Sequence, residues 1–296
     1  RGIAVADRIL LGANHHTFAD CLRLALDRGL GLEVQTFAQP EILQGNWRDL
    51  LPAYRRAGLA HLEGPLAIHG PFMDMAPGSP DPLFRQATLQ RTSDGLEAAA
   101  ALGAGTVVFH ANFLASIRHP AYREGWTQRN IDFWGPVAGR AASYGLVIAL
   151  ENMWEPDPAI IVDILAAIGS PHLRACLDVG HIGLFSAVPL AAWLETTAPY
   201  LVHMHLNNNP GDIDEHQALP HGVLDYDAIL AQIRRLPGPP TLSLGMNTVQ
   251  DLVDIIAYLR LPRRRGIIKQ KVGGSNPSRH APNPGRLVGV FDCRRG

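Results

Sequence analysis

Several short apolar runs of this sequence end in a side chain that can bind a metal or move a proton. His69, His110, Glu151, Asp178 and His205 each close such a run. Imidazole nitrogens and carboxylate oxygens are ligands that zinc and manganese take in proteins, and the same groups act as general acids and bases. If the ends of these runs meet in space, the sequence predicts a divalent metal site with proton-transfer chemistry.

Eight apolar runs alternate with segments of helical spacing, which predicts eight strand-then-helix units. The predicted strands are 8–12, 32–35, 66–69, 106–110, 147–151, 174–178, 201–205 and 241–244. The predicted helices are 17–28, 46–58, 83–102, 126–144, 159–168, 190–198, 226–235 and 249–259. Nearly continuous apolar runs are typical of parallel strands buried on both faces. We therefore predict a single (β/α)8 TIM barrel over residues 1–261, whereas an open doubly wound sheet would need a glycine-rich first turn that residues 12–15 do not supply.

In such a barrel the carboxyl ends of the strands and the following loops form one mouth, where barrel enzymes carry their reacting groups. A lone histidine at a strand end is usually only hydrogen-bonded, and Asp178 alone would be interpreted as a helix cap. Together, however, three carboxylates and five imidazoles on one face need a cation to neutralise them. The predicted metal ligands are His69, His110, Glu151, Asp178, His181, His205, Asp214 and His216.

Other side chains at or near the same strand ends suit a small polar substrate, because amide, imidazole and carboxylate groups hydrogen-bond hydroxyls and aromatic rings stack on sugars. The predicted substrate-binding residues are Asn14, His15, Glu33, Gln35, Asn152, Trp154 and Asn207. His203 lies two residues before His205, so it faces the same way deeper in the barrel. We interpret it as a core or supporting histidine.

The charge is distributed unevenly along the chain. Residues 1–260 hold 17 Arg, no Lys and 26 acidic residues, a net charge of 17 − 26 = −9, whereas 9 basic residues and one acid follow. Because proteins that grip a phosphate backbone present a basic face, the acidic barrel argues against nucleic acid as a partner. Three scattered cysteines supply neither a disulfide framework nor a thiolate metal site.

The last segment, 262–296, is rich in Gly, Pro and Arg and has little apolar periodicity. We expect it to be disordered or loosely packed, and its composition raises the hypothesis that it is a non-native extension of the barrel. Neither a membrane-spanning run nor an export leader is recognisable, so we expect a cytoplasmic protein with no membrane partner. The sequence does not predict an oligomeric state.

Six segments carry a family resemblance. They are 67–72 (Ala-Ile-His-Gly-Pro-Phe), 108–110 (Val-Phe-His), 149–152 (Ala-Leu-Glu-Asn), 176–181 (Cys-Leu-Asp-Val-Gly-His), 203–207 (His-Met-His-Leu-Asn) and 214–216 (Asp-Glu-His). With them, nearly all of residues 1–261 resembles the xylose isomerase-like TIM barrel superfamily. That superfamily contains sugar phosphate isomerases and epimerases and also abasic-site endonucleases.

The resemblance implies a metal-binding role for each matching residue. Glu151, Asp178 and His205 would hold a central ion shared by both branches. In the nuclease branch His69 and His110, with Glu151 bridging, would hold a second ion, and His181, Asp214 and His216 a third. The implied cofactor is one to three divalent ions, zinc or manganese. One position departs from the pattern: the last strand should end in a glutamate, and Gly245 stands there.

We therefore predict a metal-dependent isomerase or epimerase acting on a sugar, a sugar phosphate or a similar polyol. Glu151 and His181 are the predicted catalytic residues, with Glu151 near the migrating proton. Two alternatives stay open. One is a metal-dependent phosphodiesterase of the abasic-site endonuclease type, and the other is a sugar-binding barrel whose catalysis is impaired by Gly245.

Overall fold

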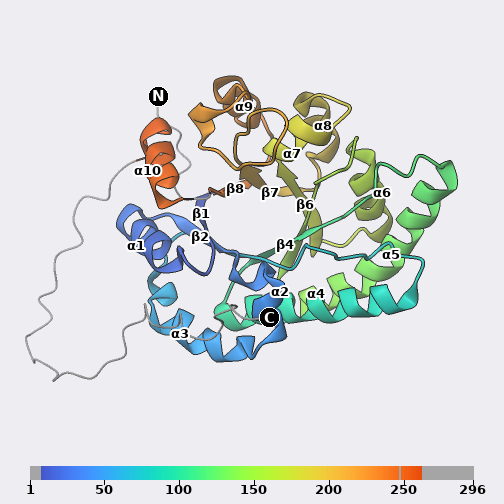
Figure 1. Cartoon of the computed structure of the whole chain (residues 1–296), viewed down its shortest axis with the longest axis horizontal. Coiled ribbons are helices and arrows are strands. Elements are labelled where there is room, and N and C mark those ends of the chain that lie inside the picture. The colour runs from blue at the N-terminus through green and yellow to red at the C-terminus, as the bar shows by residue number, and fades with distance from the viewer. Residues whose placement is uncertain (1–7, 247, 262–296) are drawn as a thin grey trace, which may run out of the picture. The chain divides into compact units, whose positions relative to one another are not determined.

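Eight parallel strands close into a barrel, as the sequence predicts. The computed structural model describes residues 8–246 and 248–261, so the predicted tail lies outside the described residues. The strands pair in chain order and β1 pairs with β8 (Figure 1). They are β1 Ile9–Ala13, β2 Gly31–Val34, β3 Leu66–His69, β4 Thr106–His110, β5 Val147–Glu151, β6 Leu173–Asp178, β7 Leu201–Leu206 and β8 Thr241–Leu244.

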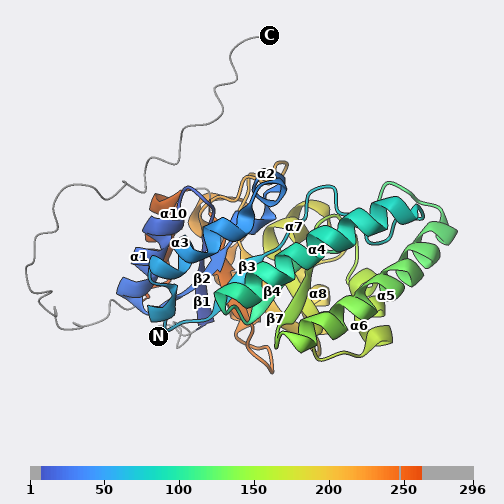
Figure 2. The same cartoon turned by 90° about the horizontal axis from the view of Figure 1, so that it is seen from below.

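Helices surround the barrel and connect its strands. They are α1 Phe18–Arg28, α2 Pro40–Gln44, α3 Leu51–Arg56, α4 Pro82–Leu102, α5 Pro120–Ser143, α6 Ala159–Ile168, α7 Val179–Phe185, α8 Leu190–Thr197, α9 Tyr226–Ile233 and α10 Val249–Tyr258. Short 3₁₀ turns are η2 Thr36–Ala38, η3 Trp47–Leu50, η4 Leu59–His61 and η5 Leu219–His221. The long helices α4 and α5 run side by side in both views (Figure 1, Figure 2). Among the described residues, no helix is both long enough and apolar enough to cross a membrane.

Several helical segments differ from the sequence prediction, among them α5, which begins at Pro120 rather than at 126. The predicted helix 46–58 is divided into η3 and α3, with Pro52 in the first turn of α3. Proline has no N–H and a fixed φ, so it suits a helix start and not an interior. Neither α2 nor α7 is predicted from the sequence. Helix α7 begins directly after β6 and contains Gly180 and Gly183, residues of poor helix propensity. Its start is stabilised by Asp178, whose side chain accepts the His181 N–H.

The barrel interior is layered, because residues two apart on a strand face the same side. The last inward-facing residues of β4 to β7 are His110, Glu151, Asp178 and His205, and those two positions earlier are Val108, Ala149, Cys176 and His203. Val108, Ala149 and Cys176 form a small buried cluster of their own. Strand register sets Glu151 beside His110, and His205 beside Asp178. The polar upper layer therefore rests on a lower layer of small side chains and one histidine.

Candidate metal and catalytic site

A cavity of about 270 Å³ opens at the carboxyl ends of the strands. It is lined by Asn14, Gln35, Ala38, Gln39, His69, Phe72, His110, Glu151, Met153, His181, His205, Asp214, His216 and Gly245. The folding of eight separate strand ends and loops thus brings together seven of the eight predicted metal ligands. The eighth, Asp178, lies against them, with its Oδ2 3.8 Å from His205 Nδ1.

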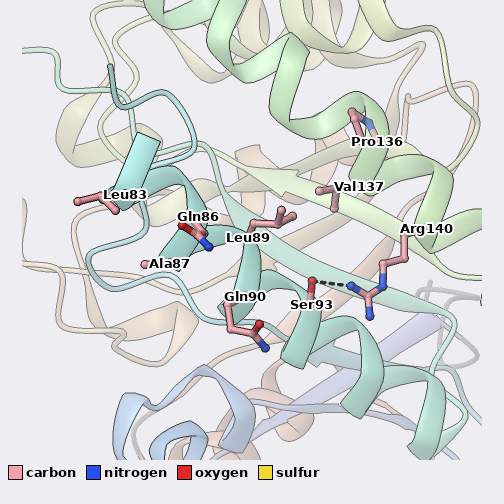
Figure 3. Close-up of a pocket in the computed structure, with 9 residues that line it drawn as sticks. All are labelled: Leu83, Gln86, Ala87, Leu89, Gln90, Ser93, Pro136, Val137 and Arg140. Atoms are coloured by element: carbon pink, nitrogen blue, oxygen red, sulfur yellow. Dashed lines mark hydrogen bonds between the residues drawn. The ribbon is translucent and has the colours of Figure 1, made fainter. Parts of the chain in front are cut away.

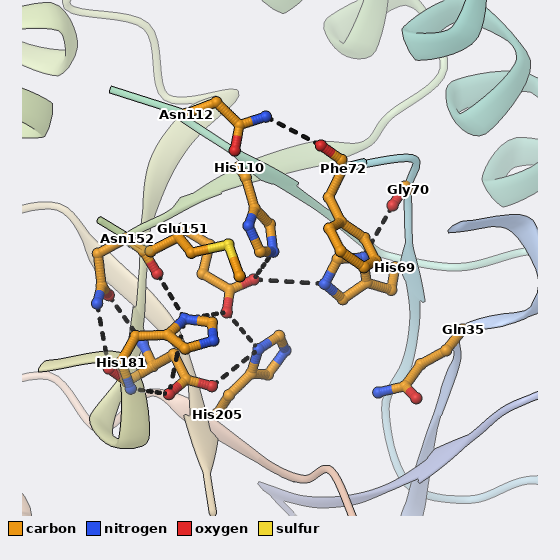
Figure 4. Close-up of polar contacts among 12 residues, drawn as sticks. Gln35, His69, Gly70, Phe72, His110, Asn112, Glu151, Asn152, His181 and His205 are labelled. Carbon is orange, nitrogen blue, oxygen red and sulfur yellow. Dashed lines mark hydrogen bonds and ion pairs between the residues drawn. The ribbon is translucent and has the colours of Figure 1, made fainter. Parts of the chain in front are cut away.

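Glu151 is the centre of the cluster (Figure 4). Its Oε1 lies 2.8 Å from His205 Nδ1, and its Oε2 faces the Nε2 atoms of His110 at 3.0 Å and His69 at 3.4 Å. Burial opposes ionisation of this carboxyl, but the nearby His205 and His110 hold its pKa well below the usual value. Glu151 is therefore a buried carboxylate among imidazoles, available to hold a cation or to accept a proton.

Three histidines of the cluster are oriented by backbone carbonyls. Each Nδ1 atom lies 2.8 Å from a backbone carbonyl oxygen. The partner of His69 is Gly70, that of His181 is Asn152 and that of His216 is Gly245. A carbonyl only accepts, so Nδ1–H donates and Nε2 is left toward the cavity. His181 Nε2 then lies 3.1 Å from Asp214 Oδ2, and His216 Nε2 lies 3.4 Å from Asp214 Oδ1. A lone pair facing a carboxylate requires a cation or an extra proton between them.

These side chains fit a divalent metal ion. The ligand atoms of His69, Glu151 and His205 lie within 4.8 Å of one another, and so do those of Asp178, His181 and His216. Glu151 Oε2 is buried, and its ion-pair contacts with His110 and His69 do not have hydrogen-bond geometry. Nitrogen and carboxylate oxygen donors, with histidines anchored through their other nitrogen, are characteristic of zinc and manganese sites. Clusters able to hold a metal are therefore present at the predicted place.

Asp178 caps a helix, one of the two roles that the sequence left open for it. Its Oδ1 accepts the His181 N–H at 2.8 Å and so caps α7, while Oδ2 accepts Asn207 Nδ2–H at 2.7 Å. Asn152 binds the Asp178 backbone on both sides, since its Nδ2–H donates to the carbonyl and its Oδ1 accepts the amide N–H. Asn152 and Asn207, predicted to bind substrate, are thus buried amides that hold Asp178 in place.

The other predicted substrate-binding residues are dispersed. Asn14 and Gln35 line the cavity. His15 contacts the Tyr54 hydroxyl through Nδ1 at 3.2 Å, and Trp154 lines a separate neighbouring cavity. Glu33 is fully buried below the cavity, where it contacts His203 and His205.

Three side chains that line the cavity were not identified from the sequence, Ala38, Gln39 and Met153. Met153 lies two residues beyond Glu151, so the alternation used for the strands could have indicated it. Gln39 follows η2, and its position depends on a loop conformation with no clear sequence signal.

A larger cavity of about 750 Å³ lies between α4 and α5 (Figure 3). It is lined by Leu83, Gln86, Ala87, Leu89, Gln90, Ser93, Pro136, Val137 and Arg140, and Arg140 donates to the Ser93 hydroxyl at 2.7 Å. None of these lining residues is a histidine, a cysteine or a carboxylate. The chemistry therefore points to the smaller cavity at the strand ends.

Metal uptake by this site is expected to release protons. Burial opposes the charging of His181, but Asp178 and the hydrogen bond with Asp214 raise its pKa from 6.5 to about 10. Without metal the ring is thus protonated at pH 8, and an ion bound to Nε2 must displace that proton. We expect zinc affinity to rise with pH up to about 10. Titration calorimetry in two buffers of different ionisation enthalpy measures the release.

The pKa shift of His181 also links stability to pH in the metal-free chain. A raised pKa contributes stability that is fully present below pH 6.5 and is lost as the pH rises through about 10. His181→Gln should reduce both this pH dependence and the proton release. Zinc binding without proton release at pH 8 in the unchanged chain would contradict a ligand role for His181.

Comparison with known proteins gives a consistent set of relatives. A family model described as a xylose isomerase-like TIM barrel matches residues 30–261. The TTHB071 protein from Thermus thermophilus, solved after soaking with ZnCl2, is 30% identical, with a TM-score of 0.71 over 86% of this chain and 96% of that chain. The 3-keto-D-glucoside 4-epimerase YcjR from E. coli shares the fold at 18% identity, with a TM-score of 0.67 over 86% of this chain and 98% of its own. An uncharacterised protein of Methanocaldococcus jannaschii, MJ1311, is 23% identical over 220 residues, 70% of this chain and 74% of that protein.

Proposed function

Because the chain belongs to the xylose isomerase-like TIM barrel family, we propose that it is a metal-dependent isomerase or epimerase acting on a sugar, a sugar phosphate or a related polyol. The observation that carries the proposal is the buried carboxylate of Glu151, which faces a cavity of about 270 Å³ among imidazoles. A cavity of this size suits a small polar molecule, and Asn14 and Gln35 offer hydrogen bonds to its hydroxyls.

In this proposal Glu151, Asp178 and His205 hold the central cation. Polarisation of the substrate carbonyl and its adjacent hydroxyl is the chemistry that a divalent ion supplies in such a site. Further ions, if bound, would be held by His69 and His110 with Glu151, or by His181 with Asp214 and His216. The anchored Nδ1 atoms of His69, His181 and His216 leave Nε2 free for that purpose.

Proton transfer falls to Glu151 and His181. The low pKa of Glu151 keeps the carboxylate ionised, so it can accept a proton from the substrate carbon. His181 lies on the neighbouring side of the cavity, with Nδ1 3.6 Å from Glu151 Oε1. With only the central ion bound, its Nε2–H can donate to a substrate oxygen. Both groups line the open cavity, so the proton that Glu151 takes up can exchange with solvent before a proton returns to carbon.

Solvent exchange tests the proposal. The zinc- or manganese-loaded protein would be incubated with a panel of ketoses and their phosphates in heavy water, and products would be analysed by NMR and mass spectrometry. We expect an isomer or epimer that carries deuterium at the carbon where the proton moves. Turnover without deuterium would indicate a hydride shift, which would refute the role of Glu151 as base but not the isomerase activity. Absence of any interconversion across the panel would refute the proposed activity.

A phosphodiesterase of the abasic-site endonuclease type is the second candidate, and a specific observation favours it. All eight residues of the three-ion pattern converge at one mouth, including Asp214 and His216 from the loop after β7. The net charge of 17 − 26 = −9 over residues 1–260 opposes binding to a phosphate backbone. Metal analysis separates the two candidates, because about three zinc ions per chain would favour the nuclease and about one the isomerase. Cleavage of a duplex with one abasic site checks the activity directly.

Gly245 can be tested as the cause of impaired catalysis. A Cβ at this position would meet only Gln35 Nε2 and His216 Nδ1, each at 3.6 Å, an ordinary contact. We therefore expect Gly245→Glu to fold and to bind manganese more tightly, since it adds a carboxylate near the cluster. A large gain in turnover would identify the natural chain as an impaired enzyme. An unchanged turnover, with Gly245→Gln as the uncharged control, would contradict the impaired-barrel alternative.

A further inference from the structure

We propose that Glu33 is a positioning residue of the metal site, which holds the His205 ring so that its Nδ1 faces Glu151 and Asp178. The proposal rests on the proposed function only in assuming that a divalent ion binds at these three residues. Glu33 would thus support a metal ligand and would not contact the substrate, although substrate contact is the role that the sequence predicts for it.

Glu33 and Glu151 lie on opposite sides of the His205 ring. Glu33 Oε2 is 3.0 Å from His205 Nε2, whereas Glu151 Oε1 is 2.8 Å from His205 Nδ1. An ionised carboxylate only accepts, so His205 Nε2–H donates to Glu33, and the metal-free ring needs a second hydrogen on Nδ1 to donate to Glu151. When a cation replaces that second hydrogen, the Nδ1 lone pair is directed between Glu151 and Asp178, whose Oδ2 lies 3.8 Å away.

A carboxylate buried in the middle of a barrel needs several hydrogen bonds to be tolerated. Glu33 is fully buried, and its Oε2 also lies 2.8 Å from His203 Nε2. Gln35 Nε2–H donates to its other oxygen, Oε1, at 3.3 Å. Both oxygens are therefore engaged, which fixes the direction in which the carboxylate faces His205.

The chain of contacts continues to β8. His203 Nδ1 contacts the Thr241 hydroxyl. Because the ring hydrogen of His203 is needed on Nε2 to donate to Glu33, Nδ1 accepts from that hydroxyl. The half-buried Thr241 and the buried His203, Glu33 and His205 thus form a continuous chain of contacts from the lower layer of the barrel to the upper one. Such carboxylate–histidine pairs behind a metal ligand orient the ligand, and their loss typically lowers metal affinity roughly 10- to 100-fold.

A second interpretation of the same residues is a metal site made of Glu33, His203 and His205, whose ligand atoms lie within 4.8 Å of one another. It is less consistent with the contacts. The distances of 2.8 and 3.0 Å from Glu33 Oε2 to the two ring nitrogens are those of hydrogen bonds. His205 would also have to bind two ions through its two nitrogens. Metal stoichiometry distinguishes the two interpretations.

Glu33→Gln tests the proposal, because it keeps the shape of the side chain but removes the charge. Zinc and manganese dissociation constants would be measured by competition with a chromophoric chelator, with the bound metal counted after dialysis. We expect affinity to fall roughly 10- to 100-fold with the number of bound ions unchanged at saturation. Nitrogen-15 NMR of the histidine rings should show His205 with hydrogen on Nε2 alone in the zinc-loaded unchanged chain, and a mixture of tautomers in the zinc-loaded variant.

Glu155→Gln is the matched control. Glu155 is also a buried glutamate near the site, but it accepts the backbone N–H groups of Phe113 and Met153. Its replacement should change stability with less than a threefold effect on metal affinity. If Glu33→Gln also changes affinity less than threefold, or if it removes one bound ion completely, the positioning role is refuted.

The role of Glu33 can be tested even if the variant does not fold or the chain binds no metal. If Glu33→Gln does not fold, the tautomer of His205 in the zinc-loaded unchanged chain decides, and hydrogen on Nδ1 with none on Nε2 would overturn the proposal. If the unchanged chain binds neither metal, the proposal fails together with the metal-dependent function. Loss of affinity in a protein that isomerises no sugar would instead support the role of Glu33 and refute only the proposed activity.

Discussion

Replacing Glu151 with glutamine should lower kcat by roughly 10²- to 10⁴-fold, the range typical of a lost general acid or base. Glu151 is the carboxylate nearest to three of the cavity imidazoles, His69, His110 and His205. The amide of a glutamine at this position can neither accept the substrate proton nor balance the charge of those imidazoles. Steady-state kinetics on the substrate identified from the ketose panel provides the measurement, with metal content determined on the same samples.

The control for Glu151→Gln is Glu195→Gln, a surface position on α8. It should leave both kinetics and metal content unchanged. If Glu151→Gln retains more than about a tenth of the turnover while binding metal normally, Glu151 is not the proton-transfer group.

Replacing Asp178 with asparagine should remove the central metal with little effect on the fold. Asparagine caps a helix as well as aspartate, so the bond to the His181 N–H can persist, while the charge that attracts a cation is lost. We expect the fall in zinc affinity to exceed the roughly 10- to 100-fold that follows loss of a partner outside the coordination sphere. Chelator competition and thermal unfolding of the metal-free protein measure the two effects separately.

Asp178→Ala is the companion variant. It should lose the metal and also the cap of α7, which costs about 1 kcal/mol of additional unfolding free energy. Equal stability of the two metal-free variants would show that the cap contributes little. Unchanged zinc affinity in Asp178→Asn would exclude this carboxylate from the coordination sphere.

The sequence predicts the barrel well because each strand is buried on both faces and therefore consists of a nearly continuous apolar run. The run Thr106–His110 is an example whose bounds are the same in the prediction and in the structure. The predicted (β/α)8 fold and the resemblance to xylose isomerase-like barrels are both confirmed. By contrast, α7 depends on the Asp178 cap and on its position directly after β6, because its sequence has poor helix propensity.

Within the site, residues on strands were easier to place than residues in loops. Trp154 lies in a loop, and its direction toward a separate cavity depends on contacts that sequence spacing does not encode. Glu33 could have been placed correctly. Glu33 and Gln35 are two residues apart, as His203 and His205 are, so both face the barrel interior in successive layers. Because Gln35 lines the cavity, Glu33 must lie one layer below it.

The lower layer of the barrel also contains a thiol, Cys176, which is fully buried beside Val108 and Ala149. Burial raises the pKa of this thiol well above its usual value, and the negative charges of Glu151 and Glu33 raise it further. A protonated, enclosed thiol reacts with alkylating reagents only after the barrel opens. The labelling rate of Cys176, located by mass spectrometry, therefore measures how often the barrel opens. A cation that binds residues from several strand ends should lower that rate.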